Sequence, residues 1–393
     1  MSSRPGICSI SLGRAAAGHS LRHRLDMAQF HGFKGIELFH EDLVSGLGNT
    51  KPFISTPAQE LAAAHAIRIM CTERGISIIC LQPFWQYEGL LDRADHYHQL
   101  TVKLPLWLEL AEALDTDLIQ VPSNFLHSGK LSTDLALAVN DLRRMADAGL
   151  AYGGDVRGRR VIRFAYEALA WGTRCDTWEQ AWHTVQVVDR PNFGLLLDTF
   201  NLAGSRVFAD PASSTPLGLI PEAHKNLRES LDRLIKEVDV EKVFYVQIAS
   251  AEKLAEPLVE GHELYVADQP ARMSWSRSCR LFYEYLPVRD VARAIFEDLG
   301  FRGWISHEVF NRRAWDTDPD VPQELASRAA YSWAKLCTEF QLRGSPSPRR
   351  SMQKSPAQET DDGKTDLHAP AGQTPTTAAS EDQEQEDGHA AFL

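Results

Sequence analysis

Residues 8–340 alternate between short runs of apolar, often β-branched residues and longer segments in which apolar residues recur at the spacing of one helix face. The short runs indicate strands, and the longer segments indicate helices. The expected strands are residues 8–12, 35–39, 77–81, 118–121, 163–169, 193–199, 243–249 and 303–309. The expected helices are residues 21–30, 57–74, 91–113, 134–150, 178–188, 222–235, 288–299 and 322–340. Each expected strand is therefore followed by a helix, in eight repeats.

Strands that alternate with helices predict an α/β protein with a parallel sheet covered by helices, and eight repeats match a (β/α)8 barrel of the TIM type. A doubly wound open sheet is the alternative. The first expected strand leads into SLGRAAAGHS, which lacks the GxGxxG spacing of a dinucleotide site, and the chain contains no Walker A sequence. These absences favour the barrel.

The composition changes at Gly344, after which Ser, Pro, Gln, Thr, Asp and Glu predominate. Such a segment buries too little apolar surface to offset the entropy that it would lose on ordering. We therefore expect residues 1–343 to form the barrel and residues 344–393 to be a disordered, acidic, Ser/Pro-rich tail. A solvated extension is favoured over a phosphorylated or partner-binding segment.

Charge and apolar content limit the classes of partner. The 41 Lys and Arg residues stand against 53 Asp and Glu residues, and this net charge of -12 disfavours binding to nucleic acid or to an anionic membrane. No apolar run approaches the roughly 20 residues that span a bilayer, and the first residues lack the apolar core of a signal peptide. Six cysteines without a CxxC pair indicate neither a disulfide framework nor a zinc–thiolate site. We expect a cytoplasmic protein.

Four of the expected strands end in an oxygen-bearing side chain. These residues are Glu167 in RFAYEALAW, Asp198 in GLLLDTFN, Gln247 in FYVQIASAE and Glu308 in WISHEVFN. They belong to the fifth to eighth strands, and the C-terminal ends of barrel strands converge on one pocket. One such residue alone more often binds a neighbouring lysine, arginine or backbone amide. Three crowded carboxylates, however, repel one another unless a divalent cation lies among them. The set predicts a site for Mg²⁺ or Mn²⁺, with Co²⁺ and Zn²⁺ as alternatives.

Eight segments, in order along the chain, resemble the fungal 3-dehydroshikimate dehydratases of quinate catabolism. These enzymes are a branch of the xylose-isomerase-like barrels, which also include sugar epimerases and endonucleases. The segments are SISLGRAAAGHS (9–20), GIELFHEDL (35–43), CLQPFWQYEGL (80–90), IRFAYEALAWGTR (162–174), RPNFGLLLDTFN (190–201), KVFYVQIASAEKL (242–254), QPARMSWSRSCRLF (269–282) and EVFNR (308–312). Each is short, but together they cover most of residues 7–342 and are specific.

The resemblance implies a lyase that converts 3-dehydroshikimate into 3,4-dihydroxybenzoate (protocatechuate) and water. Loss of a ring proton places negative charge on the substrate's ketone oxygen, which a Lewis acid stabilises. The substrate carboxylate also needs a partner, and WSRSCR in the long loop 250–286 offers arginines, whose planar fork matches a carboxylate. In the related dehydratases the Ser and the second Arg of such a segment contact substrate, which carries over to Ser276 and Arg280. Arg277 is either a further contact or a structural ion-pair partner.

Several residues are candidates for the base that removes the ring proton. Many bacterial relatives place a His three residues after the metal-binding aspartate, whereas this chain has Asn201 at that catalytic position. Asparagine cannot accept a proton at neutral pH, so the base does not carry over. The candidates are Glu37 and His40 in GIELFH, together with His127 and His262. Glu37 ends the second expected strand and is the best placed of them.

Three other functions stay open: a ketose isomerase or epimerase of the same barrel class, a non-catalytic sensor of quinate-pathway metabolites, and an abasic-site endonuclease. The WSRSCR segment argues against the first, because a neutral sugar needs no carboxylate clamp. The complete set of ligands argues against the second, and the negative net charge argues against the third. The sequence leaves the native metal and the oligomeric state undetermined.

Overall fold

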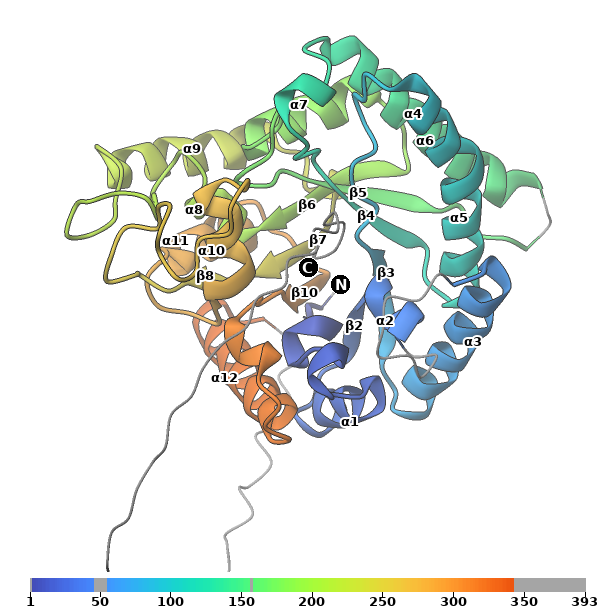
Figure 1. Ribbon diagram of the computed structural model, residues 1–393, viewed down its shortest axis with the longest axis horizontal. Coiled ribbons are helices and arrows are strands. Elements are labelled where there is room, and N and C mark those ends of the chain that lie inside the picture. Colours follow the sequence, from blue (N-terminus) through green and yellow to red (C-terminus); the bar gives the residue numbers. More distant parts are fainter. Residues whose placement is uncertain (1, 46–54, 156–157, 343–393) are drawn as a thin grey trace, which may run out of the picture. The chain divides into compact units, whose positions relative to one another are not determined.

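The computed structural model describes residues 2–45, 55–155 and 158–342, so the expected tail lies outside the described residues. Within them, eight parallel strands close into a barrel in the order β1, β10, β7, β6, β5, β4, β3, β2, surrounded by helices (Figure 1). The barrel strands are β1 (Arg4–Cys8), β2 (Gly35–Phe39), β3 (Ser77–Gln82), β4 (Leu118–Pro122), β5 (Arg163–Glu167), β6 (Phe193–Asp198), β7 (Val243–Ile248) and β10 (Trp304–His307). The prediction of a (β/α)8 barrel is confirmed. A separate two-stranded sheet joins β8 (Ser250–Ala251) to β9 (Arg280–Leu281) within the long seventh loop.

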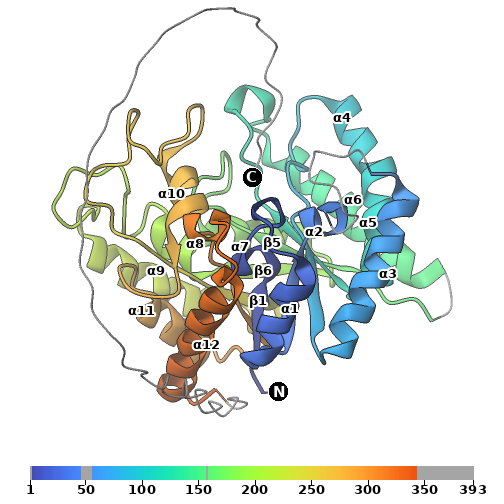
Figure 2. The same cartoon turned by 60° about the horizontal axis from the view of Figure 1, so that its bottom comes forward.

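At least one helix follows each barrel strand. The helices are α1 (Leu21–Phe30), α2 (His40–Ser45), α3 (Pro57–Glu73), α4 (Arg93–His98), α5 (Leu104–Ala113), α6 (Leu135–Asp155), α7 (Trp178–Val188), α8 (Thr199–Gly204), α9 (Ala223–Glu237), α10 (Ala271–Cys279), α11 (Val288–Arg293) and α12 (Val321–Phe340). The first and last of them, α1 and α12, lie side by side outside the barrel (Figure 2). Local caps start some helices, such as the Thr56–Gln59 capping box before Pro57 in α3.

The prediction for the first strand was wrong. The strand is Arg4–Cys8 rather than 8–12, and Ser9–Leu12 forms a 3₁₀-helix. Polar and apolar residues alternate in the CSISL run as they do in a strand. Its serine hydroxyls, however, form hydrogen bonds with backbone groups of adjacent segments, and residues 9–12 do not join the strand ladder. Ser11 Oγ, for example, accepts a hydrogen bond from Val309 N at 2.8 Å.

Two expected helices contain π-helical turns. The helix expected at 91–113 is α4 and α5 joined by a π turn at Gln99–Lys103, and the one expected at 288–299 is α11 followed by a π turn at Ala294–Asp298. Pro105 follows the first π turn and has no backbone N–H for a regular helical bond. Apolar periodicity does not reveal such turns, because apolar residues continue on both sides of them.

The apolar core has two layers, one inside the barrel and one between the strands and the helices. The interior cluster consists of Ile79, Cys80, Leu118, Ala165, Leu196 and Tyr245. Gly6 leaves room for it, because a Cβ there would lie 2.4 Å from Ile79 Cδ1. Along β5, Ala165 belongs to the interior cluster and Tyr166 to the outer one. Successive strand residues face opposite sides, so Glu167 faces the interior again.

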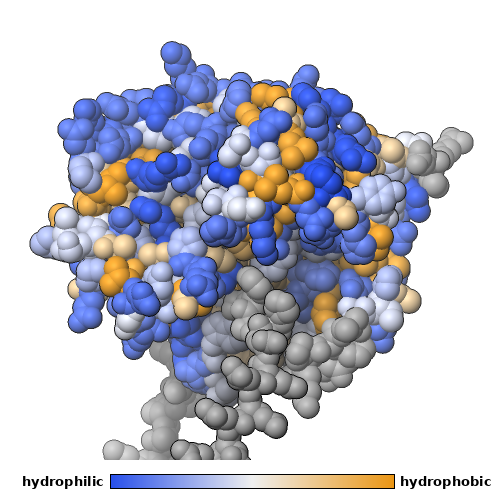
Figure 3. All heavy atoms as spheres, turned by 45° about the horizontal axis from the view of Figure 1, so that its top comes forward, coloured by the Kyte–Doolittle hydropathy of each residue, from blue (hydrophilic) through white to orange (hydrophobic). Residues whose placement is uncertain are grey.

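The surface and the thiols agree with the composition. Within the described ranges, no helix is both long and apolar enough to cross a membrane. On the face shown in Figure 3, apolar residues lie in separate groups among hydrophilic ones. Cys8, Cys71, Cys80, Cys175 and Cys279 are buried free thiols.

Candidate metal centre and active site

Acidic side chains meet at the C-terminal ends of three barrel strands. Glu167 ends β5, Asp198 ends β6, and Glu308 directly follows β10. All three are buried, and one carboxylate oxygen from each lies within 4.8 Å of the other two. The structure therefore brings together three of the four side chains that the sequence indicates as metal ligands, and we call these three the carboxylate cluster.

Gln247, the fourth expected ligand, lies beside Asp198 in the register of β6 and β7. Its Nε2 donates a hydrogen bond to Glu37 Oε2 at 2.6 Å. Its Oε1 is buried and has no hydrogen-bond partner among the described residues. A buried oxygen without a partner, next to a carboxylate, is an oxygen that a bound cation would satisfy.

Burial and mutual repulsion raise the pKa values of the carboxylate cluster. Burial raises the pKa of Glu167 well above its ordinary value, and the charges of Glu308 and Asp198 raise it further. Burial also raises the pKa of Glu308 to about 8, and it raises the pKa of Asp198 against the opposing charge of Arg280. The cluster is therefore short of positive charge. An all-oxygen donor set of this kind fits a hard divalent cation.

Arg280, the arginine expected to hold the substrate carboxylate, already binds the carboxylate cluster. It is 1% exposed, and its Nη1 donates to Asp198 Oδ2 at 2.8 Å and to Glu308 Oε2 at 2.9 Å. Its Nε donates to Ser276 Oγ at 2.9 Å. The guanidinium is therefore only partly free to bind a substrate carboxylate. Of its three nitrogens, Nη2 alone makes no hydrogen bond to a described residue. This arrangement places Ser276 and Arg280 at the cluster.

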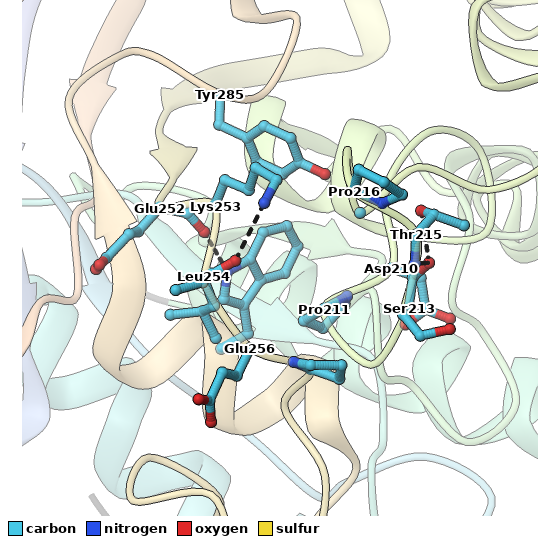
Figure 4. A pocket seen from close by; sticks show the side chains of 15 residues that line it. Asp210, Pro211, Ser213, Thr215, Pro216, Glu252, Lys253, Leu254, Glu256 and Tyr285 are labelled. Atoms are coloured by element: carbon cyan, nitrogen blue, oxygen red, sulfur yellow. Dashed lines mark hydrogen bonds between the residues drawn. The ribbon is translucent and has the colours of Figure 1, made fainter.

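The rest of the WSRSCR segment anchors the seventh loop. Arg277 Nη1 donates to Gln269 Oε1 at 3.1 Å, a contact within the loop and not with the carboxylate cluster. Trp275 is buried and its Nε1 donates to the carbonyl oxygen of Glu252 at 2.9 Å. With Tyr285 it lines a hollow of about 110 Å³ (Figure 4). These contacts favour the structural role of Arg277 over a second contact with substrate.

Glu37, the best placed candidate base, is the third of the five residues of β2 rather than its last, and it belongs to the same hydrogen-bond network. Its Oε2 accepts hydrogen bonds from Gln247 at 2.6 Å and from Gln82 at 3.2 Å. Its Oε1 is buried without a hydrogen-bond partner in the described part of the chain. Burial raises the pKa of Glu37 to about 7. A carboxyl that titrates near neutral pH and has one oxygen free is suited to proton transfer.

The histidine candidates make contacts elsewhere. His40 Nε2 lies 3.0 Å from Glu60 Oε2, and its ring stacks on Trp107 at a centroid distance of 5.0 Å. His127 and His262 each accept a hydrogen bond through Nδ1 from the backbone N–H two residues further on, both at 3.1 Å. None of these contacts joins the three histidines to the carboxylate cluster, and His127 and His262 stabilise turns.

Two amide side chains orient Glu167. Asn201 Nδ2 donates to Glu167 Oε1 at 2.7 Å and to Asp198 Oδ2 at 2.9 Å, while its Oδ1 accepts from Ala170 N at 3.0 Å. Asn201 is thus fixed as a donor, in keeping with its inability to act as the base. Gln120 Nε2 donates to Glu167 Oε2. Gln120 is not among the residues expected from the sequence, although a polar residue inside the apolar run LIQVP follows the same pattern as the expected ligands.

Comparison with known proteins finds a relative of nearly the same extent. A Neurospora crassa protein named 3-dehydroshikimate dehydratase is 52% identical over 353 residues, which cover 87% of this chain and 96% of that protein. Proteins of the same name from Pseudomonas putida and Pseudomonas aeruginosa are each 29% identical over 303 and 306 residues. The chain spans only 38% of the length of each bacterial protein.

Solved structures share the barrel. A xylose isomerase-like TIM barrel/4-hydroxyphenylpyruvate dioxygenase fusion protein has a TM-score of 0.62 at 26% identity, covering 87% of this chain and 44% of that one. The IOLI protein with a bound zinc atom has a TM-score of 0.59 at 15% identity, covering 86% and 99%, which shows a shared fold alone. The family model for xylose isomerase-like TIM barrels matches residues 25–337. This chain therefore belongs to the xylose isomerase-like TIM barrel family.

Proposed function

We propose that this chain is a 3-dehydroshikimate dehydratase, a hydro-lyase that converts 3-dehydroshikimate into protocatechuate and water in quinate catabolism. The observation that carries the proposal is the 52% identity with the Neurospora dehydratase over 96% of that protein's length. The geometry supports it, because a buried arginine, an unpaired carboxyl oxygen and a cluster of metal-binding type lie together at the C-terminal end of the barrel.

The proposal includes a divalent cation, Mg²⁺ or Mn²⁺, held by Glu167, Asp198, Gln247 and Glu308. A bound divalent cation supplies Lewis-acid stabilisation of the negative charge that develops on the ketone oxygen. Outer contacts keep the ligands in place, since Gln120 donates to Glu167 and the Gln247 amide is held by its hydrogen bond to Glu37.

Arg280 orients the substrate through its free nitrogen. Asp198 and Glu308 hold Nη1, and Ser276 Oγ holds Nε, so the guanidinium plane cannot turn. We assign Nη2 to the substrate carboxylate, with a charge-assisted hydrogen bond in a buried setting. The carboxylate then lies beside the carboxylate cluster and supplies the specificity for an acid over a neutral sugar.

Glu37 is the proposed base. Its free Oε1 takes the ring proton, and the electron pair of the broken C–H bond delocalises onto the ketone oxygen. The C–O bond to the ring hydroxyl then breaks, and the hydroxyl leaves as water with the proton that Glu37 returns. The resulting ring tautomerises to the aromatic diol, so Glu37 ends in its starting state. A pKa of about 7 suits both transfers, because the group must accept and donate within one cycle.

The test is an assay of chelator-treated protein with 3-dehydroshikimate, alone and with added Mg²⁺, Mn²⁺, Co²⁺ or Zn²⁺, following the absorbance of the aromatic product. We expect turnover only after a metal is restored. Absence of product with every metal would exclude the dehydratase, and full activity without metal would exclude the metal dependence. Turnover of a neutral ketose in preference to 3-dehydroshikimate would favour an isomerase or epimerase instead.

A further inference from the structure

A second cavity lies behind the wall of the barrel, on the opposite side of β5 from the carboxylate cluster. It measures about 410 Å³ and is lined by residues of α6 and α7 and of the loops after β3, β4 and β5. The helices α6 and α7 lie side by side (Figure 1). Leu131, Leu135, Ala138 and Leu142 give it an apolar wall. Its volume is in the range of cavities that hold small organic molecules. We call it the α6–α7 cavity.

An acidic side chain lines this cavity without a countercharge. Glu88 is 6% exposed, and its Oε1 accepts hydrogen bonds from Asn124 N at 2.7 Å and from Tyr166 Oη at 3.0 Å. Both donors are neutral. Its Oε2 is buried without a hydrogen-bond partner, and in the described ranges no Lys, Arg or His forms an ion pair with Glu88. Burying a carboxyl in this way is costly, and burial raises the pKa of Glu88 to about 7.

The other charged groups of the cavity do not supply that countercharge. The Arg174 guanidinium donates to the carbonyl oxygens of Ser132, Ser128 and Leu131, so it stabilises the loop. Asp134 and Glu179 add two more carboxylates to the lining, of which Glu179 is paired with Arg233 Nη2 at 2.8 Å, and His183 lines the same cavity. The cavity is therefore apolar with an acidic bias, which disfavours an anionic occupant and favours a cationic one.

We propose that the α6–α7 cavity is a binding site for a small organic cation, an ammonium group on a compact apolar body. The ammonium pairs with the Glu88 carboxylate, and the apolar body packs against Leu131, Leu135 and Leu142. The binding energy comes from burying apolar surface and from giving a buried carboxylate its missing countercharge. The site is distinct from the carboxylate cluster, because Tyr166 and Glu167 are consecutive in β5 and face opposite sides of the barrel wall.

Calorimetric titration of the full chain at pH 8 tests this proposal with benzylamine as the probe and with benzyl alcohol and benzoate as neutral and anionic controls of the same shape. We expect saturable binding of benzylamine, binding of benzyl alcohol that is weaker by roughly tenfold or more, and none of benzoate. Preferential binding of benzoate, or no saturable binding of benzylamine at millimolar concentration, would overturn the proposal.

Two variants assign the binding to this cavity. Glu88→Gln removes the charge and should weaken benzylamine binding by roughly tenfold or more, whereas Glu237→Gln, an exposed glutamate in α9, should leave it unchanged. Ala138→Phe places a ring at a half-buried position of the lining while keeping Glu88, and should abolish binding. Unchanged affinity in either cavity variant would overturn the proposal, and Ala138→Phe decides the matter if Glu88→Gln does not fold. The outcome is independent of the proposed dehydratase activity.

Discussion

Two buried glutamates lie on opposite sides of the same strand and meet different surroundings. Glu167, inside the barrel, is 2% exposed and shares its site with two more carboxylates and Arg280. Glu88, outside the barrel wall, is 6% exposed and has two neutral donors. Burial raises the pKa of both. Burial alone therefore does not determine the chemistry of a carboxylate. Several carboxylates together favour a divalent cation, whereas a single carboxylate in an apolar cavity favours a single positive charge.

The largest expected effect comes from removing a carboxylate on the inner side. Glu167→Ala should lower turnover by several orders of magnitude and reduce the bound metal, because a ligand and its stabilisation of the ketone oxygen are lost together. Steady-state kinetics and metal analysis after dialysis measure both quantities, with Glu237→Gln as a matched loss of one charge. Full metal content in an active Glu167→Ala variant would contradict the assignment.

On the outer side, Glu88→Gln should change how stability depends on pH. Burial raises the pKa of Glu88 from 4.5 to about 7, so folding favours the protonated form. Its contribution is fully present below about pH 4.5 and is lost as the pH rises through about 7. Since one pKa unit corresponds to about 1.4 kcal/mol, the variant should gain roughly 3 kcal/mol relative to the wild type between pH 4.5 and pH 8.

Urea unfolding of both proteins at pH 5 and pH 8 measures this difference in the free energy of unfolding. Glu237→Gln is again the control, and it should follow the wild type at both pH values because its side chain is exposed. Identical pH dependence in wild type and Glu88→Gln would show that Glu88 keeps an ordinary pKa and that the two sides of β5 differ less than the geometry indicates.

Arg280 variants test whether this arginine of the inner cluster binds substrate as well as balancing the carboxylate charge. Arg280→Ala should lower kcat/KM by roughly 30-fold or more at saturating metal, since a buried charged hydrogen bond is worth about 2 to 5 kcal/mol. The kcat/KM of Arg280→Lys should lie between those of the wild type and Arg280→Ala. Lysine keeps the charge but cannot reach Ser276, Asp198 and the substrate at once. A normal rate in the Ala variant would remove Arg280 from the substrate site.

The inner site could be predicted largely from sequence, and the outer one could not. Glu167 and Asp198 each close an apolar strand, which is a local pattern, and the barrel topology then brings strand ends together. The bond between Arg280 and Asp198 joins residues 82 positions apart through an irregular loop, so no local pattern reveals it. Likewise, Glu88 and Tyr166 are 78 positions apart, and the cavity around them depends on how α6 and α7 pack.

The smallest expected effects show whether the two sides of β5 act independently. Gln120→Leu removes the amide that donates to Glu167 Oε2, and should weaken metal binding by about tenfold, the lower end of the range for outer contacts of a metal site. Tyr166→Phe removes the hydroxyl that donates to Glu88 Oε1, and should lower the free energy of unfolding by about 1 kcal/mol. Metal titration and urea unfolding of both variants measure these two effects.

Independence of the two sides requires that Gln120→Leu leave benzylamine affinity unchanged and that Tyr166→Phe leave metal affinity unchanged, each within about twofold. If Tyr166→Phe instead weakened metal binding as much as Gln120→Leu does, the strand would transmit the state of one side to the other, and the α6–α7 cavity would be coupled to the metal centre.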